Sequence, residues 1–211
     1  MHKLLYLIVG LVALAAGFLG FYKSFYLMQP EHALYYQQPR VIKPFQLTDH
    51  QGNLFTNKQV EDKWSWVFLG YTSCPDVCPI TLQEFNFIYE DLTAIAENQV
   101  LLVSADPQRD SQEKLAQYIA YFNKDFKALR GSHGLLFPFA RNMGLMYAIT
   151  DNKNTSQTGE YLVDHSASIV LINPKGQIAA IFKPEQEIGE VPIIDGEKLI
   201  SDFEKIVRLY N

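Results

Sequence analysis

The chain has 211 residues, enough for one domain of ordinary size and a short additional segment. Apolar residues make up 48% of it, charged residues make up 19%, and the formal net charge is −5. This composition excludes a disordered chain and argues against a basic nucleic-acid-binding surface, so no nucleic-acid partner is expected.

The first feature along the chain is an uncharged, apolar stretch over residues 4–22. As an α-helix rising ~1.5 Å per residue, it approaches the ~30 Å of a bilayer core. It predicts a transmembrane helix within a membrane anchor at residues 1–27. A cleaved signal peptide remains the alternative, because Ala13, Ala15 and Ala16 supply small residues for cleavage. Both interpretations imply export, so we expect the C-terminal part on the extracytoplasmic side of the inner (cytoplasmic) membrane, in the periplasm.

Residues 28–43 are polar and contain Pro30 and Pro39, a composition typical of a linker. The folded domain is therefore predicted over residues 44–211. It opens with two short strand-like runs on either side of Gly52, which indicate a hairpin.

Alternating strand and helix patterns follow. Residues 64–71 are aromatic and β-branched, which predicts a central strand. From Pro79 to about Glu97, apolar residues recur mostly at steps of three and four, which predicts a helix with one apolar face. Further strands are predicted over 100–105, 166–172 and 177–182, and further helices over 111–122, 134–147 and 196–209. This order predicts an α/β domain with a mixed sheet.

The two cysteines of the chain, Cys74 and Cys78, lie where the predicted central strand ends and the next helix begins. Unpaired backbone N–H groups and the helix dipole favour negative charge there, so a thiol has a lowered pKa and becomes a better nucleophile or metal ligand. Their spacing lets one helical turn bring both sulfur atoms to the same side. The pair can therefore serve either metal binding or thiol-disulfide exchange.

Two structural interpretations compete with these roles. A disulfide would be ordinary in an exported protein, but so short a loop stabilises by only ~2 kcal/mol, and a domain of this size does not need it. Two inert, buried thiols are disfavoured because Pro75 and Asp76 lie between the cysteines and indicate an exposed turn.

Among the five histidines, His165 has the most informative position, because it stands at the start of an apolar run that predicts a central strand. Together with both cysteines it forms a set of two thiolates and one imidazole. Soft thiolates favour Cu(I), but the same set suits zinc with an open fourth position. Asp164 is expected to orient the imidazole. His133 is predicted to be a solvated loop residue, and Met143 and Met146 are predicted to be core residues.

Three sequence runs are typical of one known family. They are Gly-Tyr-Thr-Ser-Cys-Pro-Asp-Val-Cys-Pro at residues 70–79, Val-Ser-Ala-Asp-Pro-Gln-Arg-Asp at residues 103–110 and Val-Asp-His-Ser at residues 163–166. With these runs in the expected order, the chain from Pro44 onward resembles the Sco/SenC family of copper-binding proteins that assist assembly of cytochrome c oxidase. Its departures from the family pattern are mild; Arg130-Gly131, for example, replaces a Thr-Gly pair.

The resemblance implies a thioredoxin-like fold, an N-terminal membrane anchor and one copper ion bound by Cys74, Cys78 and His165. Cu(I) is expected, and Cu(II) is left open. The resemblance further implies delivery of copper to the binuclear copper site in a subunit of cytochrome c oxidase, with other copper chaperones or thiol reductants as further partners. Asp164 would lie behind the ligands, and Asp106, Arg109 and Asp110 would be structural residues around the loop.

An enzyme is the alternative: a thiol-disulfide oxidoreductase that reduces the cysteines of that copper site, with Cys74 and Cys78 as catalytic thiols. Two features disfavour an ordinary thioredoxin-type reductase. The cysteines are separated by three residues rather than two, and no proline precedes Ser166, where such enzymes place a cis-proline. A thiol peroxidase or redox sensor is supported only by an activatable cysteine. We therefore predict a metallochaperone, whose sulfur atoms must be reduced to bind copper.

Overall fold

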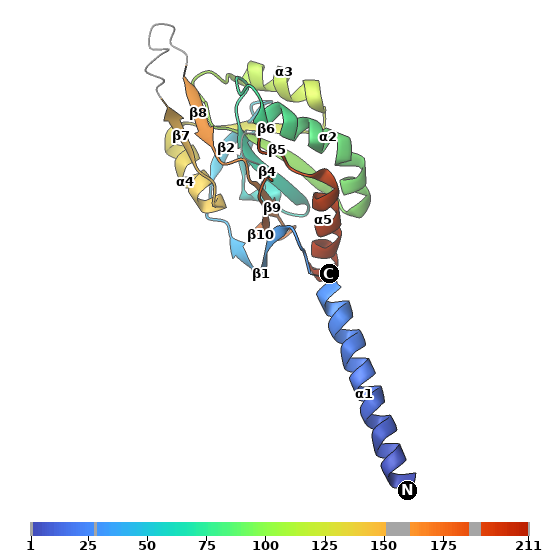
Figure 1. Cartoon of the computed structure of the whole chain (residues 1–211). Helices are drawn as coiled ribbons and strands as arrows, with labels where there is room; N and C mark the ends of the chain where they lie inside the picture. The colour runs from blue at the N-terminus through green and yellow to red at the C-terminus, as the bar shows by residue number, and fades with distance from the viewer. Residues whose placement is uncertain (1, 28, 151–160, 186–190, 211) are drawn as a thin grey trace.

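The computed structural model describes residues 2–27, 29–150, 161–185 and 191–210, which contain one large mixed sheet (Figure 1). Its strands are β1 (Ala33–Val41), β2 (Gln46–Asp49), β3 (Leu54–Thr56), β4 (Trp64–Gly70), β5 (Asn98–Ser104), β6 (Lys127–Arg130), β9 (Ile169–Ile172) and β10 (Gln177–Phe182). Their order is β1-β10-β9-β4-β5-β6-β2-β3, with β4, β5 and β6 parallel and the other neighbours antiparallel. β4 thus lies inside the sheet, as predicted.

Helices cover both faces of this sheet. The helices are α1 (His2–Leu27), α2 (Val77–Ile95), α3 (Gln112–Phe122), α4 (His133–Met143) and α5 (Gly196–Tyr210), with a short 3-10 helix, η1 (Asn57–Val60). α2, α3 and α5 bury their apolar sides on one face, around Trp66 and Phe85. α4 packs on the other face, where Phe139 and Met143 join the core. This packing confirms the predicted mixed α/β architecture.

Local sequence signals account for several element boundaries. Gly52 has φ 90° in the turn between β2 and β3, a conformation that favours glycine. The Ser111 hydroxyl caps α3 by accepting a hydrogen bond from the Lys114 N–H at 3.2 Å. Gly144 has φ 80° and ends α4. The helix predicted over residues 134–147 therefore stops earlier, because the left-handed glycine terminates it.

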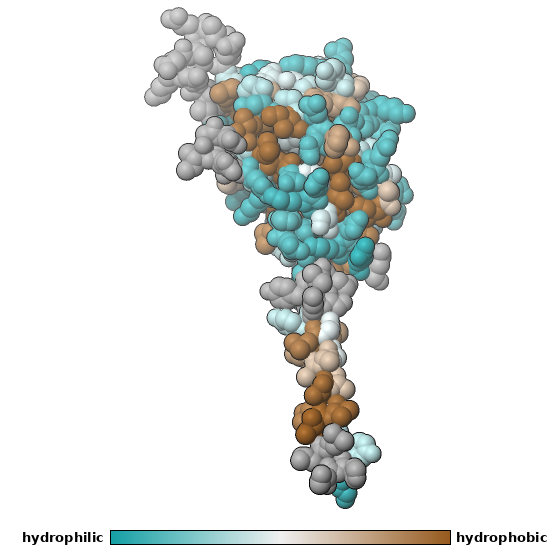
Figure 2. Space-filling view, turned by 45° about the vertical axis from the view of Figure 1, so that its right-hand side comes forward, coloured by the Kyte–Doolittle hydropathy of each residue, from teal (hydrophilic) through white to brown (hydrophobic). Residues whose placement is uncertain are grey.

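α1 projects away from the domain, and many of its exposed side chains are apolar (Figures 1 and 2). The sequence predicted a transmembrane helix here. Within the described residues, however, no helix has both the length and the apolar character needed to cross a membrane. The prediction of a membrane-spanning segment is not confirmed.

The predicted linker contains part of the folded domain. β1 pairs antiparallel with β10 at one edge of the sheet. Just before β1, the buried carboxylate of Asp202 in α5 accepts three backbone N–H groups, those of residues 31–33, at 2.8, 2.6 and 2.7 Å. These contacts show that the domain begins before residue 44. The sequence predicts a linker here because a polar edge strand that contains proline has the same composition as a linker.

Candidate metal centre

Both cysteines lie at the junction between β4 and α2, as predicted. Cys74 occupies the turn after β4, where its backbone N–H donates to the Tyr71 carbonyl at 3.1 Å. Asp76 caps α2, because its carboxylate accepts from the Val77 N–H at 2.7 Å. Cys78 follows in the first turn of α2 and is buried, whereas Cys74 is partly exposed. Both thiols are free, so they are available as ligands or nucleophiles.

Gly70, the last residue of β4, allows Cys78 to lie against the strand. A Cβ atom at Gly70 would lie 3.0 Å from the Cys78 sulfur atom and 2.6 Å from a methyl carbon of Leu102. Packed side chains do not approach so closely without displacing each other. The glycine that opens the cysteine motif is therefore a packing requirement of the site, a role that the sequence alone did not reveal.

Buried Asp110 fixes the loop that carries Cys74. Its carboxylate accepts hydrogen bonds from the backbone N–H and the hydroxyl of Thr72, at 3.1 and 2.5 Å. The Ser104 hydroxyl donates to the same carboxylate at 2.7 Å. A buried carboxylate with all these partners makes the surrounding backbone rigid. The run at residues 103–110 thus supports the cysteine motif, in agreement with its predicted structural role.

His165 reaches the site from a separate two-stranded ribbon, formed by β7 (Tyr147–Thr150) and β8 (Leu162–His165). This ribbon lies at the end of the domain opposite α1 (Figure 1). The sequence placed His165 at the start of a central strand, but that strand, β9, begins only at Ile169. His165 instead ends β8, where it pairs with Tyr147.

The imidazole of His165 directs its Nε2 atom toward the Cys78 sulfur atom, 3.4 Å away. Its Nδ1 atom lies 3.2 Å from the carbonyl oxygen of Ser166. Because a carbonyl only accepts, Nδ1 carries the proton, and Nε2 of the neutral ring presents a lone pair. The ligand atoms of Cys74, Cys78 and His165 all lie within 4.8 Å of one another. The structure therefore brings the three predicted ligands together around a space that one metal ion can bridge.

Two neighbours of His165 contact its imidazole ring. Asp164 lies on β8 with an exposed side chain, bordering the hollow at the ligand atoms. The Ser166 carbonyl contacts Nδ1, and the role predicted for Asp164 stays a prediction. The Tyr71 ring packs edge-on against the imidazole, with ring centres 5.9 Å apart and an interplanar angle of 90°. A backbone carbonyl and an aromatic ring thus hold the imidazole in place.

The two thiols have pKa values that are shifted in opposite directions. The hydrogen bond from Cys78 lowers the pKa of Cys74 to about 4; burial opposes this shift, and hydrogen bonds from the backbone N–H groups of Asp76 and Cys78 support it. The same sulfur-sulfur contact, together with burial and the negative charge of Cys74, raises the pKa of Cys78. At neutral pH the pair is therefore a thiolate at Cys74 and a thiol at Cys78.

An ion pair next to the site holds the beginning of β8. Arg109 pairs with the buried carboxylate of Asp106 and donates from Nη1 to the Tyr161 carbonyl at 2.9 Å. Its guanidinium group lies 3.8 Å from the centre of the Tyr161 ring and 5.7 Å from that of Tyr71. The Tyr161 hydroxyl completes the cluster by donating to Asp106 at 2.6 Å. The cluster connects the ribbon to the cysteine loop, a link between distant residues that no local pattern predicts.

Two other predictions require correction. His133 was expected to be solvated, but it begins α4, and its Nδ1 atom lies 2.9 Å from the Tyr147 hydroxyl oxygen. Met143 is buried as predicted, whereas Met146 is 72% exposed. Met146 follows the end of α4 at Gly144, so it does not continue the buried face of the helix.

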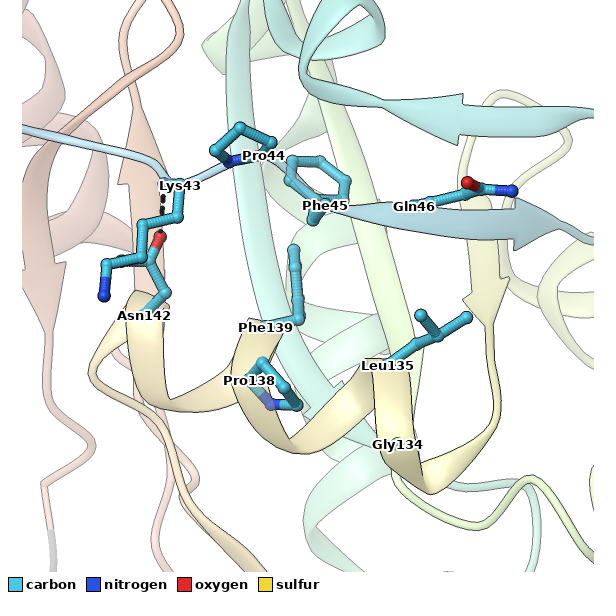
Figure 3. Close-up of a pocket in the computed structure, with 9 residues that line it drawn as sticks. All are labelled: Lys43, Pro44, Phe45, Gln46, Gly134, Leu135, Pro138, Phe139 and Asn142. Atoms are coloured by element: carbon cyan, nitrogen blue, oxygen red, sulfur yellow. Dashed lines mark hydrogen bonds between the residues drawn. The ribbon is translucent and has the colours of Figure 1, made fainter.

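Cys74 and His165 border a shallow hollow of about 260 Å³, whereas Cys78 is buried beneath it. The rim is mostly apolar and includes Pro75, Val77, Leu162, Ala167 and Pro192. A larger hollow, of about 430 Å³, lies elsewhere, beside α4 (Figure 3). The small volume at the cysteines fits a metal ion better than an organic substrate.

Comparisons with known proteins agree with this geometry. The SCO1/SenC family model matches residues 33–194. A human relative, the mitochondrial protein SCO1 homolog, is 28% identical over 167 residues, which cover 78% of this chain and 54% of the human protein. The chain thus spans about half the length of that relative.

Two solved structures share the fold. ScoI from Arabidopsis thaliana, a structure with copper bound, has a TM-score of 0.69 and 25% identity, covering 80% of this chain and 98% of that one. Apo Sco1 from Thermus thermophilus has a TM-score of 0.68 and 28% identity, covering 84% of this chain and 97% of that one. These similarities confirm the predicted thioredoxin-like fold.

Proposed function

Since the chain belongs to the SCO1/SenC family, we propose that it is a copper metallochaperone that binds one copper ion through Cys74, Cys78 and His165. One observation carries this proposal: the three ligand atoms lie within 4.8 Å of one another although the histidine is distant in sequence. The recipient that we propose is the binuclear copper site of cytochrome c oxidase, whose maturation the protein assists.

The side chains fit copper as cargo. Two sulfur ligands favour Cu(I), and the imidazole adds a donor that Cu(II) also accepts. Cys74 already carries a thiolate, and Cys78 must lose its proton when copper binds. The Nδ1 hydrogen bond of His165 keeps Nε2 directed toward the sulfur atoms. Loading therefore releases a proton and requires both thiols in the reduced form.

We further propose that the domain acts on the extracytoplasmic side of the inner membrane, with α1 as its attachment and with other copper chaperones or thiol reductants as additional partners. The exposed apolar side chains of α1 support attachment to lipid. Protease digestion of spheroplasts tests the location: the domain should be cleaved without lysis. Protection until the cells are lysed would place it in the cytoplasm.

The experiment that tests copper binding is an anaerobic Cu(I) titration of the reduced full-length chain in mild detergent, with zinc as competitor. We expect one equivalent of copper to be retained against zinc. Cys74→Ser, Cys78→Ser and His165→Ala should each weaken binding. His32→Ala, which changes an exposed histidine outside the site, is the matched control and should bind as the wild type does.

Failure of the wild-type protein to bind copper would refute the metallochaperone function. A second candidate would then gain weight: a thiol-disulfide oxidoreductase that reduces the cysteines of the same copper site. It is favoured by the partly exposed thiolate of Cys74 and the buried thiol of Cys78, which correspond to an attacking and a resolving sulfur. Fast exchange with a disulfide peptide, lost in Cys74→Ser, would support it.

A further inference from the structure

α4 forms a common wall of three neighbouring hollows, which we call the α4 groove. The first hollow, of about 430 Å³, lies between α4 and the segment before β2 (Figure 3). It shares Leu135 with a second hollow of about 510 Å³. It shares Lys43, Pro138 and Asn142 with a third of about 650 Å³. The shared residues make the three hollows one continuous surface feature.

The charge of the α4 groove differs from that of the chain as a whole. Its lining includes four cationic residues: Arg40, Lys43, Arg130 and Arg141. Three of the five arginines of the chain therefore lie on this one surface. The lining residues that the structure describes include no Asp or Glu, although the net charge of the chain is −5. The groove is thus a positive region on an acidic protein.

None of these four cations takes part in an ion pair within the described part of the chain, although Glu113 is near enough to Arg130 for that cation to help lower the Glu113 pKa. Arg40 donates only to uncharged oxygen atoms, the Tyr36 hydroxyl and the Asn142 carbonyl, both at 3.4 Å. Arg130 donates to the Pro107 carbonyl at 3.2 Å. Their positive charge therefore remains available to an anionic group from outside.

Apolar groups lie between the cations. Leu135 and Phe137 are 47% and 43% exposed. In the first hollow, the rings of Pro44, Phe45 and Pro138 lie around the space between the two segments (Figure 3). An apolar centre with a charged rim is the usual composition of a protein-binding surface.

We propose that the α4 groove is a docking site for an acidic segment of a protein partner. Carboxylates of the segment pair with the cations, and one of its apolar side chains occupies the first hollow. A polypeptide fits better than a membrane, because a flat bilayer surface does not fill hollows that apolar residues line. The charge of the groove selects against basic partners.

The proposed docking site goes beyond copper binding and contains none of the three ligands. Its position still matters for the metal centre, because His133 at the start of α4 contacts Tyr147, which pairs with His165. A partner held at α4 would therefore lie beside the ribbon that carries the third ligand. Docking and copper binding can fail independently of each other.

The test uses the full chain in phosphatidylcholine nanodiscs and a fluorescein-labelled peptide in which Glu alternates with Leu and Phe. A peptide with Gln in place of every Glu is the charge control. Anisotropy titrations should show at least ~10-fold tighter binding of the Glu peptide, with a smaller difference at high salt. Arg40→Glu/Arg141→Glu should weaken binding of the Glu peptide by ~10-fold or more.

The matched control is Lys124→Glu/Lys183→Glu, which makes the same change of charge at exposed lysines outside the groove and should alter binding by less than ~2-fold. Unchanged Cu(I) binding shows that both double variants fold. Equal binding of the two peptides, equal weakening by both double variants, or no binding at all would overturn the proposal. Protection of α4 from hydrogen exchange by phosphatidylglycerol nanodiscs, without peptide, would assign the groove to an anionic membrane instead.

Discussion

The metal ligands come from two regions of the molecule that are built differently. β4, which leads to the cysteines, is buried along its whole length and has a strand on each side. β7 and β8, which carry His165, are four residues each and pair only with each other within the described chain. The sulfur atoms are therefore positioned by the core, whereas the imidazole is positioned by the polar cluster at Arg109 and by the Tyr71 ring.

This difference teaches that the three ligands need not contribute equally. The core already orders the two sulfur atoms before copper binds, so ordering them costs little free energy on binding. The histidine lies on a peripheral ribbon, whose contacts can break while the core stays folded. Variants that change either the core or the ribbon test whether the two regions contribute differently to copper binding.

The largest effect is expected from removing a sulfur ligand. Cys78→Ser should weaken Cu(I) binding by ~1000-fold, about 4 kcal/mol. His165→Ala should weaken it by only ~10-fold, because Cu(I) prefers soft ligands and both sulfur atoms remain. Anaerobic competition with a colorimetric Cu(I) chelator measures both. Equal losses in the two variants would contradict the division between core and ribbon.

The next effect is expected from Arg109→Met, which leaves the fully buried carboxylate of Asp106 without its ionic partner. The free energy of unfolding should fall by about 3 kcal/mol. Urea denaturation measures this change, and hydrogen exchange should show lost protection in β8 but not in β4. Arg208→Met is the matched control: its ion pair with Glu204 is exposed, so a loss below ~1 kcal/mol is expected.

A smaller effect is expected on the core side from Gly70→Ala. The added methyl group meets Cys78 and Leu102, so the free energy of unfolding should fall by ~1–3 kcal/mol, and Cu(I) binding should weaken as the sulfur atom moves. Gly134→Ala is the control, because a Cβ atom there has only the Ser132 hydroxyl nearby, at 3.8 Å. Wild-type stability and copper binding in Gly70→Ala would show that the close approach is not required.

The smallest effect concerns pH. Burial favours the neutral form of Asp106, but hydrogen bonds from Tyr161 and Arg109 outweigh it and lower the pKa of this carboxyl. A lowered pKa contributes stability that is complete above the unfolded value of ~3.9 and is lost as the pH falls through the folded value. In Arg109→Met that contribution is smaller. The wild type and Arg109→Met should therefore differ most in urea midpoint near pH ~7, and this difference should become smaller below pH ~4. A difference that stays constant with pH would show that Asp106 does not cause the loss of stability.

The cysteine half of the site could be predicted from the sequence because its determinants are local. A strand pattern, two cysteines and a helix pattern follow each other directly, so the junction and the spacing fix which sulfur atoms meet. The hairpin around Gly52 and the helix capped by Ser111 were predicted for the same reason.

The histidine half was less predictable because it depends on contacts between distant residues. The apolar run after His165 singles this residue out and the Val-Asp-His-Ser run supports it, but the strand predicted for it is wrong, since nothing local shows that β8 pairs with β7 rather than continuing into β9. Arg109 reaches Tyr161 only after the chain has folded. The polar composition of β1 predicts a linker, because an edge strand and a loop can have the same composition.

The backbone just after α1, at residues 31–33, donates three hydrogen bonds to Asp202. These bonds limit how far the metal centre can move away from α1. A flexible linker after α1 would let the domain meet recipients at many distances from α1 and in many orientations. Fastening the chain at residues 31–33 removes the rest of the segment before β1 from any such linker, so the reach of the domain from α1 is shorter. With α1 attached to lipid as proposed, a shorter reach raises the effective concentration of the centre for recipients near the membrane surface and lowers it for distant ones.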